Sequence, residues 1–383
     1  MINQDSLVEA SYLLHLEHCG KLEMRSKVPL ETKRDLALAY TPGVAEICRR
    51  IVDHPEEADR LTWRKNTVAV ISDGSAVLGL GNIGPAAALP VMEGKCAIFK
   101  RFAGIDAVPI VLATQDTDKI VEIVTALAPS FGAIQLEDIS APRCFEIERR
   151  IQEKLTIPVM HDDQHGTAIV VLAGLMNALK VTQKEMGSIR VVLNGAGAAG
   201  VAIARLLVRA GVKHLTAVDR TGVIFPGRDG LTEEKRMLAD LTDIQAPGTL
   251  ADAAHGADVL IGVSAPGVFT ADILRSMAPG SIVFALANPT PEVLPDVARE
   301  AGVAVMATGR SDYANQVNNA ICYPGLFRGM LDHGVQKITD EIKLRAAHVI
   351  ASAIKAPTPE MIIPSMFDEG LHQLVAANVI AQG

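Results

Sequence analysis

The sequence predicts an α/β protein with two domains, each built on a parallel sheet, and a helical C-terminal tail. Strand-like apolar stretches alternate with helix-like stretches along most of the chain after residue 66, a pattern typical of strand–helix–strand units. Acidic clusters close two of these stretches, and a glycine-rich loop follows a third. We therefore expect an N-terminal α/β domain at 1–165, a second α/β domain at 166–320 and a helical segment at 321–383 that packs on the first domain.

The composition excludes several classes of protein. The chain has 383 residues, which is too long for one ordinary domain, and its 49% hydrophobic content provides a large core. A net charge of −8 without a basic run argues against nucleic acid as a partner. The longest apolar stretch, 168–176, is shorter than the roughly 20 residues that cross a bilayer, so we expect no membrane contact. No secretory signal is visible and the five cysteines lack paired spacing, which favours the cytoplasm.

The first informative stretch of the chain contains a tyrosine beside a helix start. Residues 6–16 carry apolar side chains at helical spacing, and we expect that helix to pack on the rest of the protein. Thr41 is a good N-cap and Pro42 a good first helical residue, so a helix should run from there to about residue 52. Tyr40 precedes it, either as a packed side chain or as a functional phenol.

A lysine stands inside the mostly apolar segment 86–99. Burying the ammonium of Lys95 is costly, so its side chain either extends to the surface or serves a function. In the functional interpretation, burial and a nearby cation lower the lysine pKa until it acts as a base. The glycine turn before it, 79–84, matches G-x-G-x-x-G but has no acid about 20 residues later. We interpret that turn as a close-packed element on the substrate side.

Two acidic clusters follow neighbouring strand-like stretches. Glu137 and Asp138 follow one such stretch, whereas Asp162 and Asp163 follow another at 157–160, with a helix-like segment between them. In a parallel sheet both carboxyl ends meet at one edge. Carboxylates gathered there repel one another unless a cation lies among them, and hard oxygen ligands select Mg²⁺ or Mn²⁺. The alternative is that these acids cap helices and are solvated.

A second glycine loop has the full context of a dinucleotide site. It comes directly after a strand-like stretch and opens a helix, and Asp219 ends the next strand 24 residues after Gly195. The glycines permit a tight turn and close approach of a pyrophosphate to the helix N-terminus, and the acid accepts hydrogen bonds from the ribose. The second domain is therefore expected to be a Rossmann-type, doubly wound domain that binds NAD; Arg220 leaves NADP open. The loop residues expected to contact the cofactor are Gly195, Gly197, Ala198, Ala199 and Gly200.

Amide side chains mark the rest of the expected site. Asn288 follows a strand-like stretch in the crevice where ligands of such sheets bind, so it is a candidate for cofactor or substrate contact. Residues 309–319 concentrate further amides, among them Asn318, which suit a carboxylate or a nicotinamide group. A solvated loop would explain the same residues.

Taken together, the motifs resemble those of the malic enzymes, specifically the compact bacterial type without a fused acyltransferase domain. The resemblance covers nearly the whole chain in the family's order. The stretches that carry it are Tyr40-Thr41-Pro42-Gly43-Val44-Ala45, Gly79 to Gly84, Glu93-Gly94-Lys95, Leu136-Glu137-Asp138, His161 to Thr167, Gly195 to Gly200, Asn288-Pro289-Thr290 and Gln316-Val317-Asn318-Asn319.

This resemblance implies oxidative decarboxylation of L-malate to pyruvate and CO₂ with NAD(P)⁺ and Mg²⁺ or Mn²⁺, in a dimer or larger homo-oligomer. It also implies roles for single residues. Lys95 matches the general base, Tyr40 the general acid, and Asp162 a residue near the lysine. Asn288 and Asn318 match positions that hold the substrate. The metal ligands implied by the resemblance are Glu137, Asp138 and Asp163.

One position departs from the longer eukaryotic members of the family. They carry an arginine for a substrate carboxylate shortly before the glycine turn, whereas this chain has Ser75, Ala76 and Val77 there. The metal and the amides are then expected to take over more of that contact. Two alternatives remain: a malolactic or tartrate-type reaction on the same fold, and an NAD-binding protein without catalysis.

Overall fold

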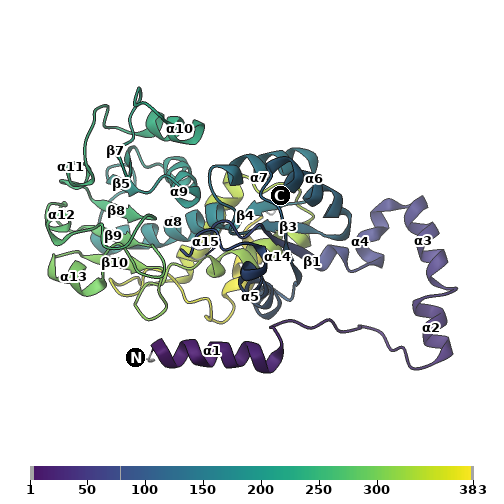
Figure 1. Ribbon diagram of the computed structural model, residues 1–383. Helices are drawn as coiled ribbons and strands as arrows, with labels where there is room; N and C mark the ends of the chain where they lie inside the picture. Colours follow the sequence, from purple (N-terminus) through teal and green to yellow (C-terminus); the bar gives the residue numbers. More distant parts are fainter. Residues whose placement is uncertain (1–3, 78, 381–383) are drawn as a thin grey trace.

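The computed structural model describes residues 4–77 and 79–380 and contains two parallel sheets joined by a long helix (Figure 1). The first sheet has the order β2-β1-β3-β4. Every residue of its central strands β1 and β3 is buried, which explains why these strands are runs of apolar side chains rather than alternating ones. The elements of this part are β1 (Thr67–Ser72), α5 (Pro85–Ala103), β2 (Asp106–Val111), α6 (Thr117–Leu127), η3 (Ala128–Ser130), β3 (Ala133–Leu136), α7 (Arg143–Lys154) and β4 (Val159–His161).

The second sheet has the order β10-β9-β8-β5-β6-β7, and it is parallel except for the short strand β7. The first strand of this sheet in sequence is β5, and later strands are added on both sides of it. The switch point therefore lies between β5 and β8, where ligands of such sheets bind. The doubly wound arrangement expected for this domain is confirmed. Its elements are β5 (Arg190–Asn194), α9 (Ala198–Arg209), β6 (His214–Asp219), β7 (Gly222–Val223), α10 (Glu233–Leu241), α11 (Leu250–Ala254), β8 (Val259–Gly262), α12 (Ala271–Arg275), β9 (Ile282–Ala285), α13 (Pro295–Glu300) and β10 (Val305–Thr308).

The helix α8 (Asp162–Thr182) connects the two sheets. It begins at Asp162 and runs without a break across the expected domain boundary at 165/166. That boundary stays a prediction. Among the described residues it is the one helix long and apolar enough to cross a membrane, but 67% of that apolar window is buried inside the protein. Its hydropathy therefore reflects a core position.

The C-terminal tail is helical, as expected. After η4 (Asn319–Ile321) come α14 (Tyr323–His333), α15 (Asp340–Ala353) and α16 (Leu371–Asn378). The helices α14 and α16 pack on each other and on α5 of the first domain, whereas α15 packs on α8 and α9. Within this contact Asn177 donates its amide hydrogens to the carbonyl oxygens of Ala351 and Ile362, which fixes the tail to α8.

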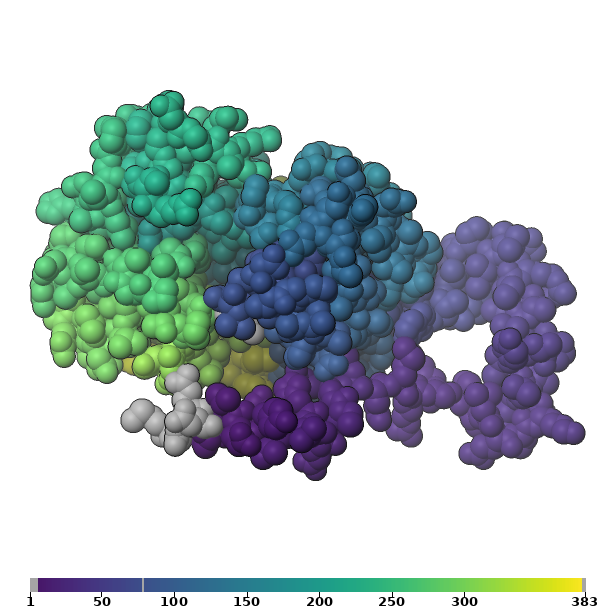
Figure 2. Space-filling view, in the orientation of Figure 1, coloured from purple at the N-terminus to yellow at the C-terminus, as the bar shows by residue number. Residues whose placement is uncertain are grey.

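The N-terminal part of the chain differs from the rest because none of the residues 6–66 is buried. It contains α1 (Gln4–His18), α2 (Lys33–Ala39), α3 (Val44–Asp53), η1 (Pro55–Glu57), α4 (Ala58–Leu61) and η2 (Arg64–Asn66). We call residues 22–61 the N-terminal arm. Figures 1 and 2 show the arm leaving the body beyond α1, extending outward through α2 and α3, and returning to β1. The expectation that the first helix is packed is therefore wrong within one chain: Leu7 and Leu13 on α1 are about half exposed.

Candidate active site

Three of the expected carboxylates form one cluster at the edge of the first sheet. Glu137 and Asp138 follow β3, and Asp163 lies in the first turn of α8, directly after β4. Because β3 and β4 are parallel, with Leu136 opposite His161, their carboxyl ends coincide. One ligand oxygen from each acid lies within 4.8 Å of the other two. This spacing can hold a single metal ion.

The cluster carries more negative charge than its protein neighbours balance. Burial and the adjacent acids raise the pKa of Glu137 well above its usual range, although Lys95 opposes this. Burial and the charge of Asp163 raise the pKa of Asp138 to about 7. Oδ2 of Asp138 is buried and has no hydrogen-bond partner among the described residues. A buried acceptor without a partner is costly, so the cluster suits a cation.

Asp163 is held by two groups of its own cluster. Its Oδ2 accepts a hydrogen bond of 2.8 Å from the backbone N–H of Asp138 and lies 3.2 Å from Nε2 of His161. Burial alone would raise the pKa of Asp163, but the contact with His161 outweighs burial and lowers the pKa. The carboxylate therefore stays charged, as a ligand must. About a third of its side-chain surface is exposed, so the cluster opens to solvent on this side.

Lys95 on α5 lies beside the same cluster. Its Nζ atom is 2.7 Å from Oδ2 of Asp162 and 2.9 Å from Oε1 of Glu137. It also donates to Oδ1 of Asn319 at 3.2 Å and lies 4.8 Å from the ring centroid of Tyr323. Asp162 thus lies next to the lysine, as the family pattern implied.

The charges around Lys95 set the direction of its pKa shift. Burial alone would lower the Lys95 pKa, but Asp162 and Glu137 outweigh burial and raise the pKa well above its usual value. A lowered pKa therefore needs a positive charge from outside the chain. The interpretation of Lys95 as a surface lysine is wrong, because 12% of its side chain is exposed.

The ion pair between Lys95 and Asp162 leaves no room for a side chain at residue 166, which is a glycine. A Cβ atom on residue 166 would lie 1.9 Å from Oδ1 of Asp162, so no larger residue fits behind this carboxylate. The helix α8 can therefore bring Asp162 onto Lys95 while Asp163, the next residue, turns towards Asp138. The glycine thus leaves room for the Asp162 carboxylate inside the first turns of α8.

Tyr40 does not join this cluster within one chain. It forms the C-cap of α2, its backbone N–H donates to the carbonyl of Leu36, and 65% of its side chain is exposed. The expected N-cap at Thr41 is also wrong, because α3 begins at Val44 with Gly43 as its N-cap. The turn between α2 and α3 is so tight that a Cβ atom on Gly43 would lie 2.6 Å from the carbonyl oxygen of Ala37. The local hydrogen bonds of this turn displace the helix start.

The amides lie at the same edge, with one difference from the expectation. Asn319, which the sequence interpretation did not select, contacts Lys95 directly. Asn318, its neighbour, accepts from the backbone N–H of Ala320 and caps η4, so its role in substrate binding stays a prediction. Asn288 follows β9 and is exposed; its carbonyl oxygen would lie 2.1 Å from a Cβ atom on Gly79. The first glycine turn therefore packs closely against the second domain, beside the expected site.

The guanidinium of Arg143, on α7, lies beside Ser75, one of the residues that stand in this sequence where the longer family members have an arginine. Nη2 of Arg143 lies 2.9 Å from Oδ2 of Asp73 and 3.0 Å from Oγ of Ser75, and Nη1 donates to the carbonyl of Gln115. Nη2 also donates to Ser140. Arg143 fixes the loop beside the acidic cluster, and no sequence spacing indicated this contact.

The second glycine loop has the geometry expected for a dinucleotide. Gly195 has a φ of 126°, and a Cβ atom there would lie 2.6 Å from the carbonyl oxygen of Val263. A Cβ atom on Gly200 would lie 1.9 Å from the carbonyl oxygen of Gly195. These two glycines therefore permit the turn and the close packing of α9. A Cβ atom on Gly197 would meet no protein atom within 4 Å. That space lies at the N-terminus of α9, which begins with Ala198 and Ala199, where a pyrophosphate binds favourably.

Asp219 ends β6 as expected, but it is surrounded by cations that the sequence interpretation did not select. Its Oδ2 lies 2.5 Å from Arg228 and 2.7 Å from Lys235, and its Oδ1 accepts from Thr221. These contacts outweigh burial and lower the pKa of Asp219 well below its usual value. Arg220, the residue proposed for NADP, is exposed. The charged acid suits a ribose, whereas the neighbouring cations suit a phosphate, so the local geometry accommodates either cofactor.

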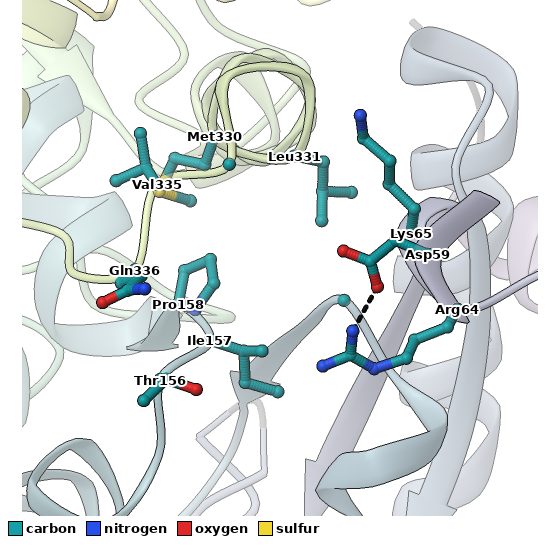
Figure 3. A pocket seen from close by; sticks show the side chains of 12 residues that line it. Asp59, Arg64, Lys65, Thr156, Ile157, Pro158, Met330, Leu331, Val335 and Gln336 are labelled. Atoms are coloured by element: carbon teal, nitrogen blue, oxygen red, sulfur yellow. Dashed lines mark hydrogen bonds and ion pairs between the residues drawn. The ribbon is translucent and has the colours of Figure 1, made fainter. Parts of the chain in front are cut away.

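A separate pocket of about 290 Å³ lies at the root of the N-terminal arm (Figure 3). Arg64 and Lys65 line one side, where Arg64 pairs with Asp59, and the loop around Pro158 and the end of α14 at Leu331 line the other sides. None of the residues proposed for catalysis, metal or cofactor lines this pocket. The candidate active site is therefore the acidic cluster beside Lys95, not this pocket.

The fold and the site define an α/β oxidoreductase with a Rossmann-type nucleotide domain and an acidic centre beside a buried lysine. Comparison with known proteins identifies the family. Residues 19–152 match the family model of the malic enzyme N-terminal domain, and residues 164–382 match that of the malic enzyme NAD binding domain. The chain belongs to the malic enzyme family, whose members are decarboxylating oxidoreductases.

Individual relatives agree with this assignment. An NAD-dependent malic enzyme from Geobacillus stearothermophilus is 52% identical over 377 residues, which cover 97% of this chain and 78% of the relative. A bifunctional malic/malolactic enzyme from Bacillus subtilis is 51% identical over 378 residues, 98% of this chain and 92% of the relative. Other relatives are named NADP-dependent malic enzymes. The crystal structure of an NAD-dependent malic enzyme from Thermotoga maritima superposes with a TM-score of 0.93 at 47% identity, covering 96% of this chain and 98% of that one.

Proposed function

We propose that this chain converts L-malate to pyruvate and CO₂ with reduction of NAD⁺ or NADP⁺ and that the reaction depends on a divalent metal. The observation that carries the proposal is the contact between Lys95 and two carboxylates at the edge of the metal cluster. Family membership supports the reaction, and the relatives named for either cofactor support both nicotinamides. The proposal is tested by whether the protein releases free pyruvate and CO₂ from L-malate.

The residues of the cluster fit a hard divalent cation. Glu137, Asp138 and Asp163 supply three oxygen ligands, and the buried Oδ2 of Asp138 lacks a partner among the described residues. Oxygen donors of this kind suit Mg²⁺ or Mn²⁺. When bound there, such an ion supplies Lewis-acid stabilisation of negative charge on the substrate oxygens.

In the proposed reaction Lys95 acts as a neutral amine, a state that a divalent cation bound at the neighbouring carboxylates would favour, and takes the proton of the malate C2 hydroxyl. The C2 hydride passes to the nicotinamide, which gives oxaloacetate. The bond between C3 and C4 then breaks, CO₂ leaves, and the electron pair stays on the three-carbon product as enolpyruvate. Tyr40 donates the proton that C3 needs to become pyruvate. Proton transfer by a positioned side chain typically contributes about 10² to 10⁴ in rate.

The remaining residues position the reactants. Asp162 and Asn319 hold the Lys95 ammonium from two sides. We assign Asn288 and Asn318 to substrate contact and the loop 195–200 to the pyrophosphate, with Asp219 at the ribose. The reactants are then small molecules bound between the two sheets, and the proposed location of the protein is the cytoplasm.

A malolactic reaction is the second candidate, because one relative is named a bifunctional malic/malolactic enzyme. That reaction would release lactate, because a reduced nicotinamide retained in the site would supply hydride to the carbonyl of pyruvate. The two candidates differ in products: pyruvate accompanies reduced nicotinamide in equal amount, whereas lactate appears without it.

The experiment that tests the proposal follows the near-ultraviolet absorbance of reduced nicotinamide. Purified protein receives L-malate, Mn²⁺ and NAD⁺ or NADP⁺ in turn, and pyruvate and lactate are quantified in the same samples. We expect reduced nicotinamide and pyruvate in equal amounts and no turnover after chelation of the metal. Absorbance that does not change with either cofactor would contradict the proposal.

A further inference from the structure

We propose that Glu148 on α7 is a positioning residue that holds Asp163 ready for metal binding. Among the described residues Glu148 makes no hydrogen bond or ion pair with the three carboxylates of the acidic cluster, and it acts through the first turn of α8. The inference rests on the proposed function, because it concerns the proposed metal site. Mn²⁺ binding in the absence of substrate tests it separately from turnover.

The first turn of α8 has two faces. One face carries Asp162 and Asp163 into the active site, where they meet Lys95 and a backbone N–H of the acidic cluster. The other face turns towards α7, which packs on β4, the strand that leads into α8 (Figure 1). The polar residues of this second face all contact the carboxylate of Glu148, and they are His161, Gln164 and His165.

Glu148 takes the place of a cap for this helix. His161 is the N-cap residue of α8, but its own side chain makes no capping hydrogen bond. Instead Oε1 of Glu148 accepts the backbone N–H of His161 at 2.8 Å. Oε2 accepts from the side-chain amide of Gln164 at 3.2 Å and lies 3.0 Å from Nε2 of His165. Because negative charge is favourable at a helix N-terminus, this carboxylate fixes the turn that bears the two acids of the active site.

The side chain of Glu148 is charged although it is buried. Its exposed fraction is 5%, and a buried carboxylate is stable only when its oxygens accept hydrogen bonds. Burial alone would raise the pKa of Glu148, but His165 and His161 outweigh burial and lower the pKa to about 2. A charged carboxylate accepts hydrogen bonds and donates none. The direction of the hydrogen bonds in this network therefore follows from Glu148.

The network leads from Glu148 to the proposed ligand Asp163. Gln164 must turn its NH₂ group to Glu148, and the nitrogen of that group also lies 3.1 Å from Nδ1 of His161. Nδ1 is then the acceptor, so the ring N–H is on Nε2. This atom lies 3.2 Å from Oδ2 of Asp163 and has no other partner among the described residues. The same Oδ2 accepts the backbone N–H of Asp138, so two N–H groups hold the carboxylate in place.

A purely structural role for Glu148 is the alternative. Ile147 and Ile151, its neighbours on α7, are buried in the core, so the side chain could simply fill space between α7 and α8. The two interpretations differ in what the side chain must supply. Packing requires a side chain of the right shape, whereas positioning requires two acceptor oxygens. Glutamine provides the shape and aspartate provides the acceptors.

The experiment measures Mn²⁺ binding by calorimetric titration in the absence of malate and nicotinamide. Glu148→Gln keeps the shape but places an NH₂ group opposite one of the donors, so the turn loses a hydrogen bond. The Mn²⁺ affinity should fall about 10- to 100-fold. Glu148→Asp is shorter but keeps both acceptor oxygens, and it should bind Mn²⁺ more tightly than Glu148→Gln. The reverse order, or wild-type affinity in Glu148→Gln, would overturn the proposal.

Gln164→Leu tests the network without a change at Glu148. The contacts of Glu148 with the backbone of His161 and with His165 remain, so the helix start is kept. The ring of His161 loses the donor at Nδ1, and its N–H is no longer held on Nε2. We expect Mn²⁺ binding to weaken about tenfold. This variant also carries the test if Glu148→Gln does not fold, and wild-type Mn²⁺ affinity in Gln164→Leu would overturn the network.

Glu146→Gln is the matched control on the same helix. Glu146 pairs with Arg150, and about half of its side chain is exposed. Its substitution should leave the Mn²⁺ affinity unchanged, and a decrease equal to that in Glu148→Gln would assign the effect to the charge of α7 and overturn the proposal. Fluorescence titration with NAD⁺ should give the wild-type affinity in each variant. Parallel loss of NAD⁺ and Mn²⁺ binding in both Glu148→Gln and Gln164→Leu would show general disruption of the fold and would overturn the positioning role.

Two outcomes separate this inference from the proposed function. If Glu148→Gln binds Mn²⁺ like the wild type while Asp163→Ala does not, the metal site stands and the positioning role fails. If Glu148→Gln weakens Mn²⁺ binding but the wild-type chain reduces no nicotinamide with malate, the positioning role stands and the proposed function fails.

Discussion

Lys95 on α5 and Asp162 on α8 form a buried ion pair, with 2.7 Å between Nζ and Oδ2. The two residues are 67 positions apart in sequence. Their ion pair joins α5, which precedes β2 of the first sheet, to α8, which leads into the second sheet. Because Asp163 is the next residue along α8, this pair also sets the distance between Lys95 and the acidic cluster of Glu137, Asp138 and Asp163.

The first prediction concerns Lys95 itself. Lys95→Ala should lower kcat by about 10² to 10⁴, because the proton of the substrate hydroxyl loses its acceptor. Lys100→Ala changes a second lysine of the same helix, whose ammonium is mostly exposed and pairs with Asp106, and should stay near the wild-type rate. Steady-state reduction of nicotinamide with saturating malate measures both. Equal rates for the two variants would remove Lys95 from the mechanism.

The second prediction concerns the metal ligands. Asp163→Ala should weaken Mn²⁺ binding at least about tenfold, since one of three charged oxygen ligands is lost. Asp162→Asn changes the neighbouring acid, whose oxygen contacts Lys95, and should weaken Mn²⁺ binding less. Calorimetric titration of Mn²⁺ into each variant gives the affinities. An unchanged affinity in Asp163→Ala would take Asp163 out of the cluster.

The third prediction separates two glycines of the nucleotide loop. Gly200→Ala should lower the melting temperature, because its Cβ would overlap the carbonyl of Gly195 at 1.9 Å and the loop must distort. Gly197→Ala should leave the melting temperature unchanged and weaken NAD⁺ binding, because its Cβ meets no protein atom and instead occupies the space proposed for the pyrophosphate. Thermal unfolding and fluorescence titration with NAD⁺ measure the two effects. A stable Gly197→Ala variant with wild-type affinity would place the cofactor elsewhere.

The fourth prediction concerns the choice of cofactor. Asp219→Asn removes the carboxylate that neutralises Arg228 and Lys235 and that would repel a 2′-phosphate. The ratio of kcat/KM for NADP⁺ to that for NAD⁺ should therefore rise about tenfold, which corresponds to about 1.4 kcal/mol. Asp243→Asn changes an exposed acid that pairs with His214 and should leave the ratio unchanged. A constant ratio in Asp219→Asn would show that the acid does not contact the ribose.

The parallel-sheet rule is the reason that much of the site could be predicted from the sequence. Glu137 and Asp163 are distant in sequence, but each follows a strand, and the ends of parallel strands meet. Gly195 and Asp219 were selected from a local pattern, in which a strand, a glycine loop, a helix, a second strand and an acid follow one another in sequence. Such patterns depend on neighbouring residues and can be recognised without knowledge of the tertiary structure.

Other contacts could not be predicted because they depend on side chains from distant elements. Arg228 and Lys235 reach Asp219 from the loop and helix after β7, and Arg143 reaches Ser75 from α7, with no periodic signal in the sequence. Tyr40 shows a different limit. Its local motif was recognised, yet the motif did not indicate that the arm leaves the body, since exposed and buried apolar helices look alike in sequence.

The most direct test of the account is the position of Mn²⁺ in crystals grown with Mn²⁺ and L-malate in the absence of nicotinamide. The anomalous signal should place the ion among Glu137, Asp138 and Asp163, with the malate hydroxyl within hydrogen-bond distance of Lys95 Nζ. A manganese peak at another position, or malate bound away from Lys95, would contradict the assignment of this cluster as the active site.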